Sequence, residues 1–159
     1  MNEEKTIYGY AGNILRINLT DQSTELIPTE RYAKTYIGGR SIAYRIYWEE
    51  MTSDIKALDP ENKLIYMTGP TTATAIPSGG RSVFVSLSPR TLPEMCTWSG
   101  LGGWFGAELK FAGFDGLIIE GKAAAPTYLF INDGEIQFLS AERTELPALQ
   151  RSMCRCPAA

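Results

Sequence analysis

The amino-acid sequence predicts an α+β fold, with a largely antiparallel β-sheet and a few short helices. Two observations support this class. Segments whose apolar residues alternate with period two outnumber segments with helical period, and turn residues separate them in the manner of hairpins. The chain also has 159 residues, of which 44% are hydrophobic and 21% charged, which is typical of a single globular domain.

The strands are expected where apolar residues alternate, or form short runs, between turn residues. In chain order these segments are residues 13–19, 24–27, 63–68, 82–87, 94–98, 116–121, 127–132 and 135–139. The segment 94–98 has the weakest pattern of the set. Between the last two segments, Asp133 and Gly134 form a strong signal for a two-residue hairpin turn.

Three short helices are expected between these strands. Thr29 is a suitable N-cap for the first helix, which extends to Tyr36 and ends before a pair of glycines. The segment 40–51 places its apolar residues on one helical side, as in a helix that packs on a sheet. The third helix is expected at 103–111, with Gly113 at the C′ position that favours glycine.

Composition excludes several classes of function. The formal net charge is −3 and the basic residues form no stripe, so nucleic acid is not an expected partner. No apolar run approaches the roughly 18 residues of a membrane span, and the first ten residues lack the apolar core of a signal peptide. The sequence therefore predicts a soluble, cytoplasmic protein with no membrane partner.

The chain contains no histidine, which excludes Ser-His and Cys-His catalytic pairs and histidine-ligated zinc. Its three cysteines are Cys96, Cys154 and Cys156. A disulfide framework would need an even, spread set, so this one favours a reducing compartment. Cys154 and Cys156 could supply half of a metal site, but no second pair exists, and an exposed tail is the simpler interpretation.

Glycines gather in the segment 99–121, which contains the third expected helix, and several of them lie at the start of that helix. Gly100-Leu101-Gly102-Gly103 follows a candidate strand and opens that helix, so its N–H groups and the positive end of the helix dipole would face an anion. Two other interpretations stay open. One is a dinucleotide-binding loop, with Glu120 near the place of a ribose-binding acid; the other is a tight turn that needs glycine only for packing.

A second glycine-rich loop, residues 69–81, ends in Gly79-Gly80-Arg81 directly before a strand. A guanidinium on a rigid strand beside flexible backbone is suited to bidentate recognition of phosphate or carboxylate. The simpler interpretation is a solvated arginine at the edge of a strand. Two glycine-rich loops and one arginine in a short domain favour an anionic ligand.

Five segments of the chain also form a recognisable series. In order they are GYAGNILRINLT, GGRSIAYRI, ENKLIYMTGPTTATAIPSGGR, GGWFGAELKFAGFDGLIIEGKA and YLFINDGEIQF. Together they resemble the N-terminal domain of the aldehyde ferredoxin oxidoreductase family, whose members are tungsten or molybdenum bis-pterin enzymes. The resemblance extends from about residue 8 to about residue 138 and is most specific in the third and fourth segments.

The resemblance implies that this domain is a base on which a bis-pterin cofactor lies. In the family, glycine-rich backbone and an arginine contact the pterin phosphates and a bridging magnesium ion. Arg81 matches that arginine, which in the family reaches the pterin and lies close to a 4Fe–4S cluster. Gly102 matches a family glycine, and Gly100 stands where some members have asparagine, so that only a backbone contact carries over. The expected cofactor-binding residues are Arg81, Gly100 and Gly102, with no catalytic residue and no metal ligand.

The implied function is the N-terminal, pterin-cradling portion of an enzyme that oxidises aldehydes to carboxylic acids with ferredoxin as electron acceptor. The cluster ligands are expected in later domains, and a homo-oligomer is compatible with the resemblance. Residues 1–140 are expected to form an incomplete pterin-binding domain and 141–159 a frayed or abnormal tail, as in a truncated member. The alternative is a non-catalytic remnant, or a small interaction protein that uses the same fold without cofactor.

Overall fold

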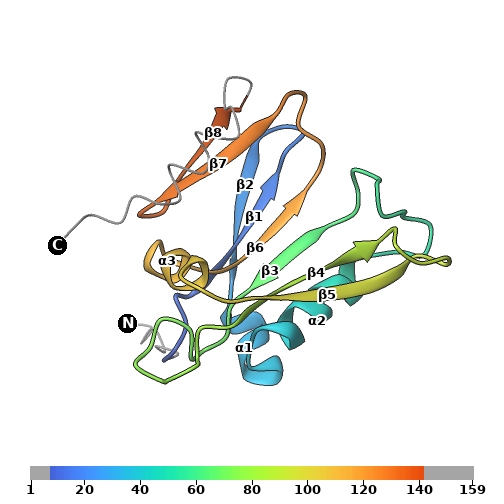
Figure 1. The fold of residues 1–159 in the computed structure, drawn as a ribbon. Coiled ribbons are helices and arrows are strands. Elements are labelled where there is room, and N and C mark those ends of the chain that lie inside the picture. Colours follow the sequence, from blue (N-terminus) through green and yellow to red (C-terminus); the bar gives the residue numbers. More distant parts are fainter. Residues whose placement is uncertain (1–7, 142–159) are drawn as a thin grey trace.

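The computed structural model describes residues 8–141, which form a six-stranded sheet, three short helices and a separate hairpin (Figure 1). In chain order the elements are β1 (Asn13–Asn18), β2 (Ser23–Pro28), α1 (Glu30–Tyr36), α2 (Arg40–Glu50), β3 (Leu64–Met67), β4 (Ser82–Ser88), β5 (Met95–Leu101), α3 (Phe105–Phe111), β6 (Phe114–Glu120), β7 (Thr127–Asn132) and β8 (Glu135–Ser140). The expected α+β class is confirmed.

The large sheet has the order β2-β1-β6-β3-β4-β5. Its neighbouring strands are antiparallel except for β1 and β6, which run parallel. The expectation of a largely antiparallel sheet is therefore confirmed. The hairpin is confirmed as well: β7 pairs with β8, and both turn residues, Asp133 and Gly134, have the positive φ angles (45° and 83°) that such a turn requires.

Alternating side chains give the sheet two buried faces. Residues such as Ile14 and Ile65 belong to a cluster that includes α1 and α2, whereas the next residue along, Leu15 or Tyr66, belongs to a cluster with α3 and the hairpin. In Figure 1, α1 and α2 lie together, well apart from α3. Because helices or the hairpin cover both faces, the central strands are apolar on both sides.

Two boundaries differ from the sequence-based expectation. β5 extends past the expected residue 98 to Leu101, because Gly100 pairs with Val83 and Leu101 pairs with Ser82 of β4. Gly100 therefore lies inside a strand and not in a helix-opening loop. The third helix starts at Phe105, two residues later than expected, since Gly103 adopts a φ of 88° that no α-helix contains.

Thr29 precedes α1 as expected, but its side chain forms no cap for the helix. Its hydroxyl donates instead to the carboxylate of Asp115 on β6 (2.7 Å). Cys96 lies half-buried in β5, while Cys154, Cys156 and most of the expected tail lie outside the described residues. Between residues 8 and 141, every helix is too short or too polar to cross a membrane.

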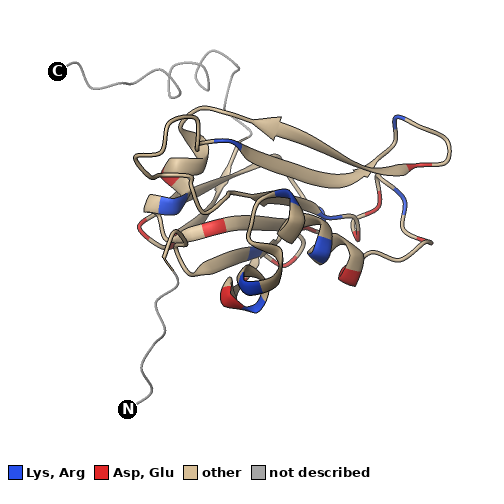
Figure 2. Ribbon diagram, turned by 90° about the horizontal axis from the view of Figure 1, so that it is seen from below, with Lys and Arg blue, Asp and Glu red and all other residues tan. Residues whose placement is uncertain are grey.

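Charged residues of both signs are distributed around the described ribbon (Figure 2). One network gathers them at the end of the sheet where β1 and β6 finish. Arg16 forms ion pairs with Glu50 at the end of α2 and with Glu120 at the end of β6, and Lys63 approaches Glu120 to 2.9 Å. This network ties the last residues of α2 to the sheet.

Candidate functional site

Glycine-containing segments from separate parts of the chain meet at the other end of the sheet. Met67 pairs with Val83, and Ser82 pairs with Leu101, so the end of β3, the start of β4 and the end of β5 lie side by side. The start of α2 joins them, because the amide of Gly39 donates to the carbonyl of Thr68 (2.8 Å). We call this region the glycine-rich end; its glycines are Gly38, Gly39, Gly69, Gly79, Gly80, Gly100, Gly102 and Gly103.

Three of these glycines have no structural need, within the described residues, to be glycine. Gly69, Gly80 and Gly102 have no left-handed φ, and a Cβ atom added at any of them would meet no atom within 4 Å. The need is visible at Gly79, where an added Cβ would lie 2.8 Å from the carbonyl oxygen of Thr71. Glycines that face open space let another molecule approach the backbone closely.

Arg81 and Gly100 come together on one face of the β4–β5 pair. A Cβ atom added at Gly100 would lie 3.6 Å from Nη1 of Arg81. The Arg81 side chain is exposed, and within the described residues it forms no hydrogen bond or ion pair with another side chain. Gly102 follows just after the end of β5. The structure thus brings the three sequence-predicted site residues together, with an available guanidinium beside bare backbone.

The dinucleotide-binding interpretation of this stretch is wrong. Such a fold joins parallel strands through a helix, with the ligand at the turn that enters the helix. Here α3 joins β5 to β6, and these strands run in opposite directions and are not neighbours. Glu120, which would bind a ribose in that interpretation, pairs with Arg16 and Lys63 at the opposite end of the sheet.

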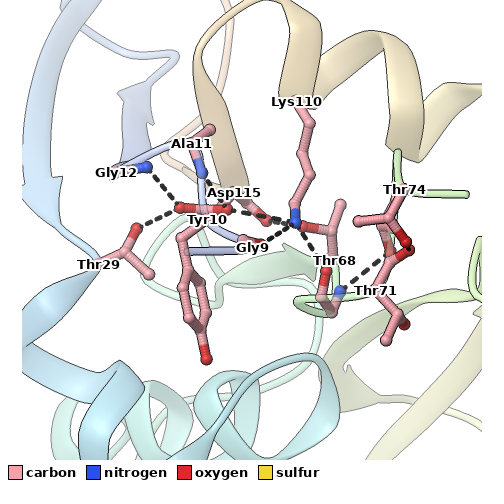
Figure 3. A network of polar contacts seen from close by, with 12 residues as sticks. Gly9, Tyr10, Ala11, Gly12, Thr29, Thr68, Thr71, Thr74, Lys110 and Asp115 are labelled. Atoms are coloured by element: carbon pink, nitrogen blue, oxygen red, sulfur yellow. Dashed lines mark hydrogen bonds and ion pairs between the residues drawn. The ribbon is translucent and has the colours of Figure 1, made fainter. Parts of the chain in front are cut away.

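A buried polar network beneath the glycine-rich end was not foreseen from the sequence. The ammonium of Lys110, on α3, donates to the carbonyls of Gly9 (2.6 Å) and Gly69 (2.8 Å), and it lies 3.8 Å from the carboxylate of Asp115 (Figure 3). That carboxylate accepts hydrogen bonds from the amides of Ala11 and Gly12, each at 2.9 Å. The Thr29 hydroxyl donates to the same carboxylate. The hydrogen-bond partners of Lys110 are therefore all acceptors, and those of Asp115 are all donors.

Burial sets the electrostatics of this network. Desolvation lowers the pKa of Lys110, and the charge of Asp115 opposes that shift. Burial, with the nearby Asp115 carboxylate, raises the pKa of Tyr10. Each group therefore prefers its neutral form more than it would in water. The charged form of Lys110 is stabilised by its carbonyl and carboxylate partners. The only sequence signal was a charged pair, Lys110 and Asp115, within the otherwise apolar run KFAGFDGLII.

The network positions the loop that carries Arg81. Gly69 begins the loop 69–81, and Lys110 holds the carbonyl at this beginning. Within the loop, the hydroxyls of Thr71 and Thr72 donate to the carbonyl of Gly79 (3.1 and 3.3 Å). The start of the loop is thereby bonded to α3, and its two ends are bonded to each other. A rigid loop of this kind presents its arginine in one place, as ligand recognition requires.

The described residues offer backbone amides and guanidinium groups at this end, not metal ligands. Among residues 8–141 no group of three or more Cys, Asp and Glu side chains could hold a metal ion. Cys96 lies against Tyr47, and burial raises the pKa of its thiol, which disfavours the reactive thiolate. The arrangement is suited to hold an anionic group in place and supplies no acid, base or nucleophile of its own.

Comparison with known proteins identifies the fold and its context. The family described as "Aldehyde ferredoxin oxidoreductase, N-terminal domain" matches residues 14–150. The chain belongs to this family. The resemblance seen in the sequence motifs is therefore confirmed over almost the whole length of the chain.

Curated relatives within the aldehyde ferredoxin oxidoreductase family include tungsten enzymes. The tungsten-containing aldehyde ferredoxin oxidoreductase of Pyrococcus abyssi is 44% identical over 138 residues, which are 86% of this chain and 22% of that protein. The corresponding protein of Pyrococcus furiosus is 43% identical over 139 residues, 85% of this chain. This chain thus spans about a fifth of the length of these relatives.

Members with other names share the same segment. The aliphatic sulfonate oxidoreductase, WOR-like subunit, of Pyrococcus furiosus is 35% identical over 141 residues, with 86% of this chain and 22% of that protein covered. Among solved structures, the active-site complex BamBC of benzoyl coenzyme A reductase, in complex with 1,5-dienoyl-CoA, matches with a TM-score of 0.85 and 28% identity. The match covers 91% of this chain and 23% of that one. The likeness extends from the sequence to the fold.

Proposed function

We propose that this chain is the N-terminal, pterin-cradling portion of a tungsten- or molybdenum-dependent oxidoreductase that converts aldehydes to carboxylic acids. One observation carries the proposal. At the glycine-rich end, Gly69, Gly80 and Gly102 have open space at the Cβ position and no left-handed φ, and Arg81 has no side-chain partner within residues 8–141. An anionic ligand that approaches the backbone closely accounts for both facts.

The residues present fit a phosphate-bearing pterin cofactor. Arg81 would supply a planar fork of donors to a phosphate, and the backbone of Gly100 and Gly102 would allow close approach. A magnesium ion at the phosphates would add positive charge to that of Arg81. Bound in this way, the metal-pterin group would supply the redox chemistry, with water as the source of the second carboxylate oxygen and two electrons leaving the aldehyde.

The role of this chain in that reaction is to bind and orient. In this proposal other parts of the enzyme would hold a 4Fe–4S cluster, whose chemistry would be electron transfer to ferredoxin in the cytoplasm. The names of the relatives support the division: one is an aldehyde enzyme, one an aliphatic sulfonate enzyme and one a benzoyl coenzyme A reductase complex, yet all contain this segment. A part that recurs with different substrates is suited to hold a group that the enzymes would have in common, and in this proposal that group is the cofactor.

A chimeric enzyme tests the proposal. Residues 8–141 of this chain would replace the 138-residue matching segment of the Pyrococcus abyssi enzyme, followed by measurement of tungsten per protein and aldehyde oxidation with a viologen dye. We expect tungsten to be retained, and Arg81→Lys to lower it, because lysine cannot reproduce the planar fork. Arg90→Lys, on an exposed turn at the opposite end of β4, is the control and should change nothing.

The same experiment distinguishes the proposal from the alternative, a domain that binds no cofactor. A folded chimera that contains no tungsten would favour a domain that uses the family fold without cofactor. Equal tungsten in the Arg81→Lys and Arg90→Lys variants would return Arg81 to the role of a solvated arginine at a strand edge.

A further inference from the structure

The chain contains a second Gly-Gly-Arg segment that the proposed function does not use. Residues Gly38-Gly39-Arg40 lead into α2 as Gly79-Gly80-Arg81 lead into β4. The first segment packs against the loop that ends at Arg81: the Gly39 amide donates to Thr68, and a Cβ atom at Gly38 would lie 3.0 Å from Cδ of Pro70. Both arginines therefore leave the glycine-rich end of the same sheet.

Arg40 is held over an aromatic ring on β5. The guanidinium carbon of Arg40 lies 4.7 Å from the ring centroid of Trp98, a cation–π contact between the start of α2 and the edge strand. Trp98 and Gly100 are two residues apart on β5 and so point to the same face, about 7 Å apart. Since Arg81 lies against Gly100, the two arginines are neighbours along one face of β5.

Neither arginine has its charge neutralised within the described residues. Among the described arginines, Arg16 and Arg45 have carboxylate partners, Glu50 and Glu49 (2.7 Å for the second pair), whereas Arg31 and Arg90 also form no ion pair. Arg40 and Arg81 form no ion pair and no side-chain hydrogen bond between residues 8 and 141. Two like charges on the same face of β5 repel each other, and an anion that binds both would remove that repulsion.

We infer that Arg40, oriented by Trp98, is a second anchor for the ligand of Arg81, so that the two guanidiniums together bind a ligand with two phosphate groups. The inference rests on the proposed function, because it assigns a further residue to the same ligand. The stack on Trp98 fixes the plane of the Arg40 fork before binding, which reduces the entropy lost when its hydrogen bonds form. A single phosphate group would accept hydrogen bonds from one guanidinium, whereas two linked phosphate groups would accept them from both.

Trp98 itself reports on this binding. In the full 159-residue chain, Trp48→Phe and Trp104→Phe would leave Trp98 as the sole tryptophan, and both replaced side chains are largely exposed (79% and 77%). Inorganic pyrophosphate and inorganic phosphate would then be titrated separately while Trp98 emission is followed. We expect pyrophosphate to bind at least about tenfold more tightly than phosphate, because it engages two charge-assisted forks in place of one.

Three variants give the inference its test. Arg40→Gln should weaken pyrophosphate binding about tenfold and leave phosphate binding nearly unchanged, while Arg81→Gln should weaken both. Arg40→Lys keeps the charge but not the planar fork, so it should lose most of the preference for pyrophosphate. Arg31→Gln is the control, since Arg31 also lies over an aromatic ring, that of Tyr32, but on α1.

The outcomes distinguish this inference from the proposed function. If Arg81→Gln weakens binding and Arg40→Gln does not, Arg40 only covers Trp98, and the inference is overturned while the cofactor proposal stands. If pyrophosphate shows no preference over phosphate in the unaltered chain, the two-arginine site is also overturned. The tungsten content of the chimera reports on the cofactor proposal separately.

Discussion

The ammonium group of Lys110 and the carboxylate of Asp115 lie 3.8 Å apart, and their side chains retain only 6% and 2% of their solvent exposure. A buried pair of this kind is costly to break from one side, because the remaining charge keeps its desolvation penalty without its partner. Here the pair also joins the segment around Gly9 to the loop that starts at Gly69. Its loss would affect the fold and the position of the candidate site together.

Replacing Lys110 with methionine should lower the free energy of unfolding by about 3 kcal/mol, since it leaves the Asp115 carboxylate buried with neutral donors only. Urea denaturation of the 159-residue chain measures this value. Lys122→Met, at an exposed position, is the matched control and should stay within about 0.5 kcal/mol. Adding Asp115→Asn to the Lys110 variant should recover part of the lost free energy of unfolding. If the loss in the double variant equals the sum of the losses in the two single variants, the two charges do not interact.

The pH dependence of stability should carry the signature of the buried lysine. Burial lowers the pKa of Lys110 below its ordinary value of 10.5, so between the lowered pKa and 10.5 the unfolded chain binds more protons than the folded one. The free energy of unfolding therefore rises with pH in that window, relative to the Lys110→Met variant. Urea denaturation of both proteins at several pH values from about 7 to 10 checks the sign. If the difference between the free energies of unfolding of the two proteins narrows as pH rises, the charge of Asp115 outweighs burial in setting the pKa of Lys110.

Gly102 and Gly103 should respond in opposite ways to substitution by valine. Gly102 has no left-handed φ and open space at its Cβ position, so Gly102→Val should leave the fold intact. In the chimeric enzyme it should lower tungsten content, because the added methyl groups would occupy ligand space. Gly103 has a φ of 88°, so Gly103→Val should destabilise the chain by more than about 1 kcal/mol. Full tungsten content in the Gly102 variant would remove the ligand role of that glycine.

The 159-residue chain alone should not oxidise aldehydes, even when supplied with cofactor. The chain has no histidine, and residues 8–141 contain no cluster of side chains able to hold a metal ion. Aldehyde turnover with a viologen acceptor is the measurement, with the chimeric enzyme as the positive control. Sustained turnover by the chain alone would show that residues assigned here to binding also take part in the reaction.

The elements of this fold could be predicted from local patterns, whereas their pairing could not. Alternation located the strands, and Asp133-Gly134 located the hairpin turn, because both depend on neighbouring residues. The parallel pairing of β1 with β6 joins segments about a hundred residues apart, and no local pattern signals it. The same holds for the end of β5, where hydrogen bonding to β4 overrides the low strand propensity of Ser99 and Gly100.

The candidate site was predictable to a similar degree. Glycines before a strand and a helix, with Arg81 beside them, indicated an anionic ligand, and the family resemblance indicated a pterin cofactor; both stay predictions. The contact of Arg40 with Trp98 depends on how α2 packs on the sheet, so the sequence alone did not indicate it. The Lys110–Asp115 pair was missed for the same reason: its hydrogen bonds reach residues that are distant in the chain.

The open Cβ positions at Gly69, Gly80 and Gly102 have a practical consequence for engineering. In the proposed cradle, folding and ligand choice would depend on different residues, so we expect that the three positions can be randomised together without sampling mostly unfolded proteins. A library of this kind would ask which side chains let the same scaffold accept cofactors of different size or charge. Selection would then act on recognition directly, with little of the screening effort lost to misfolded clones.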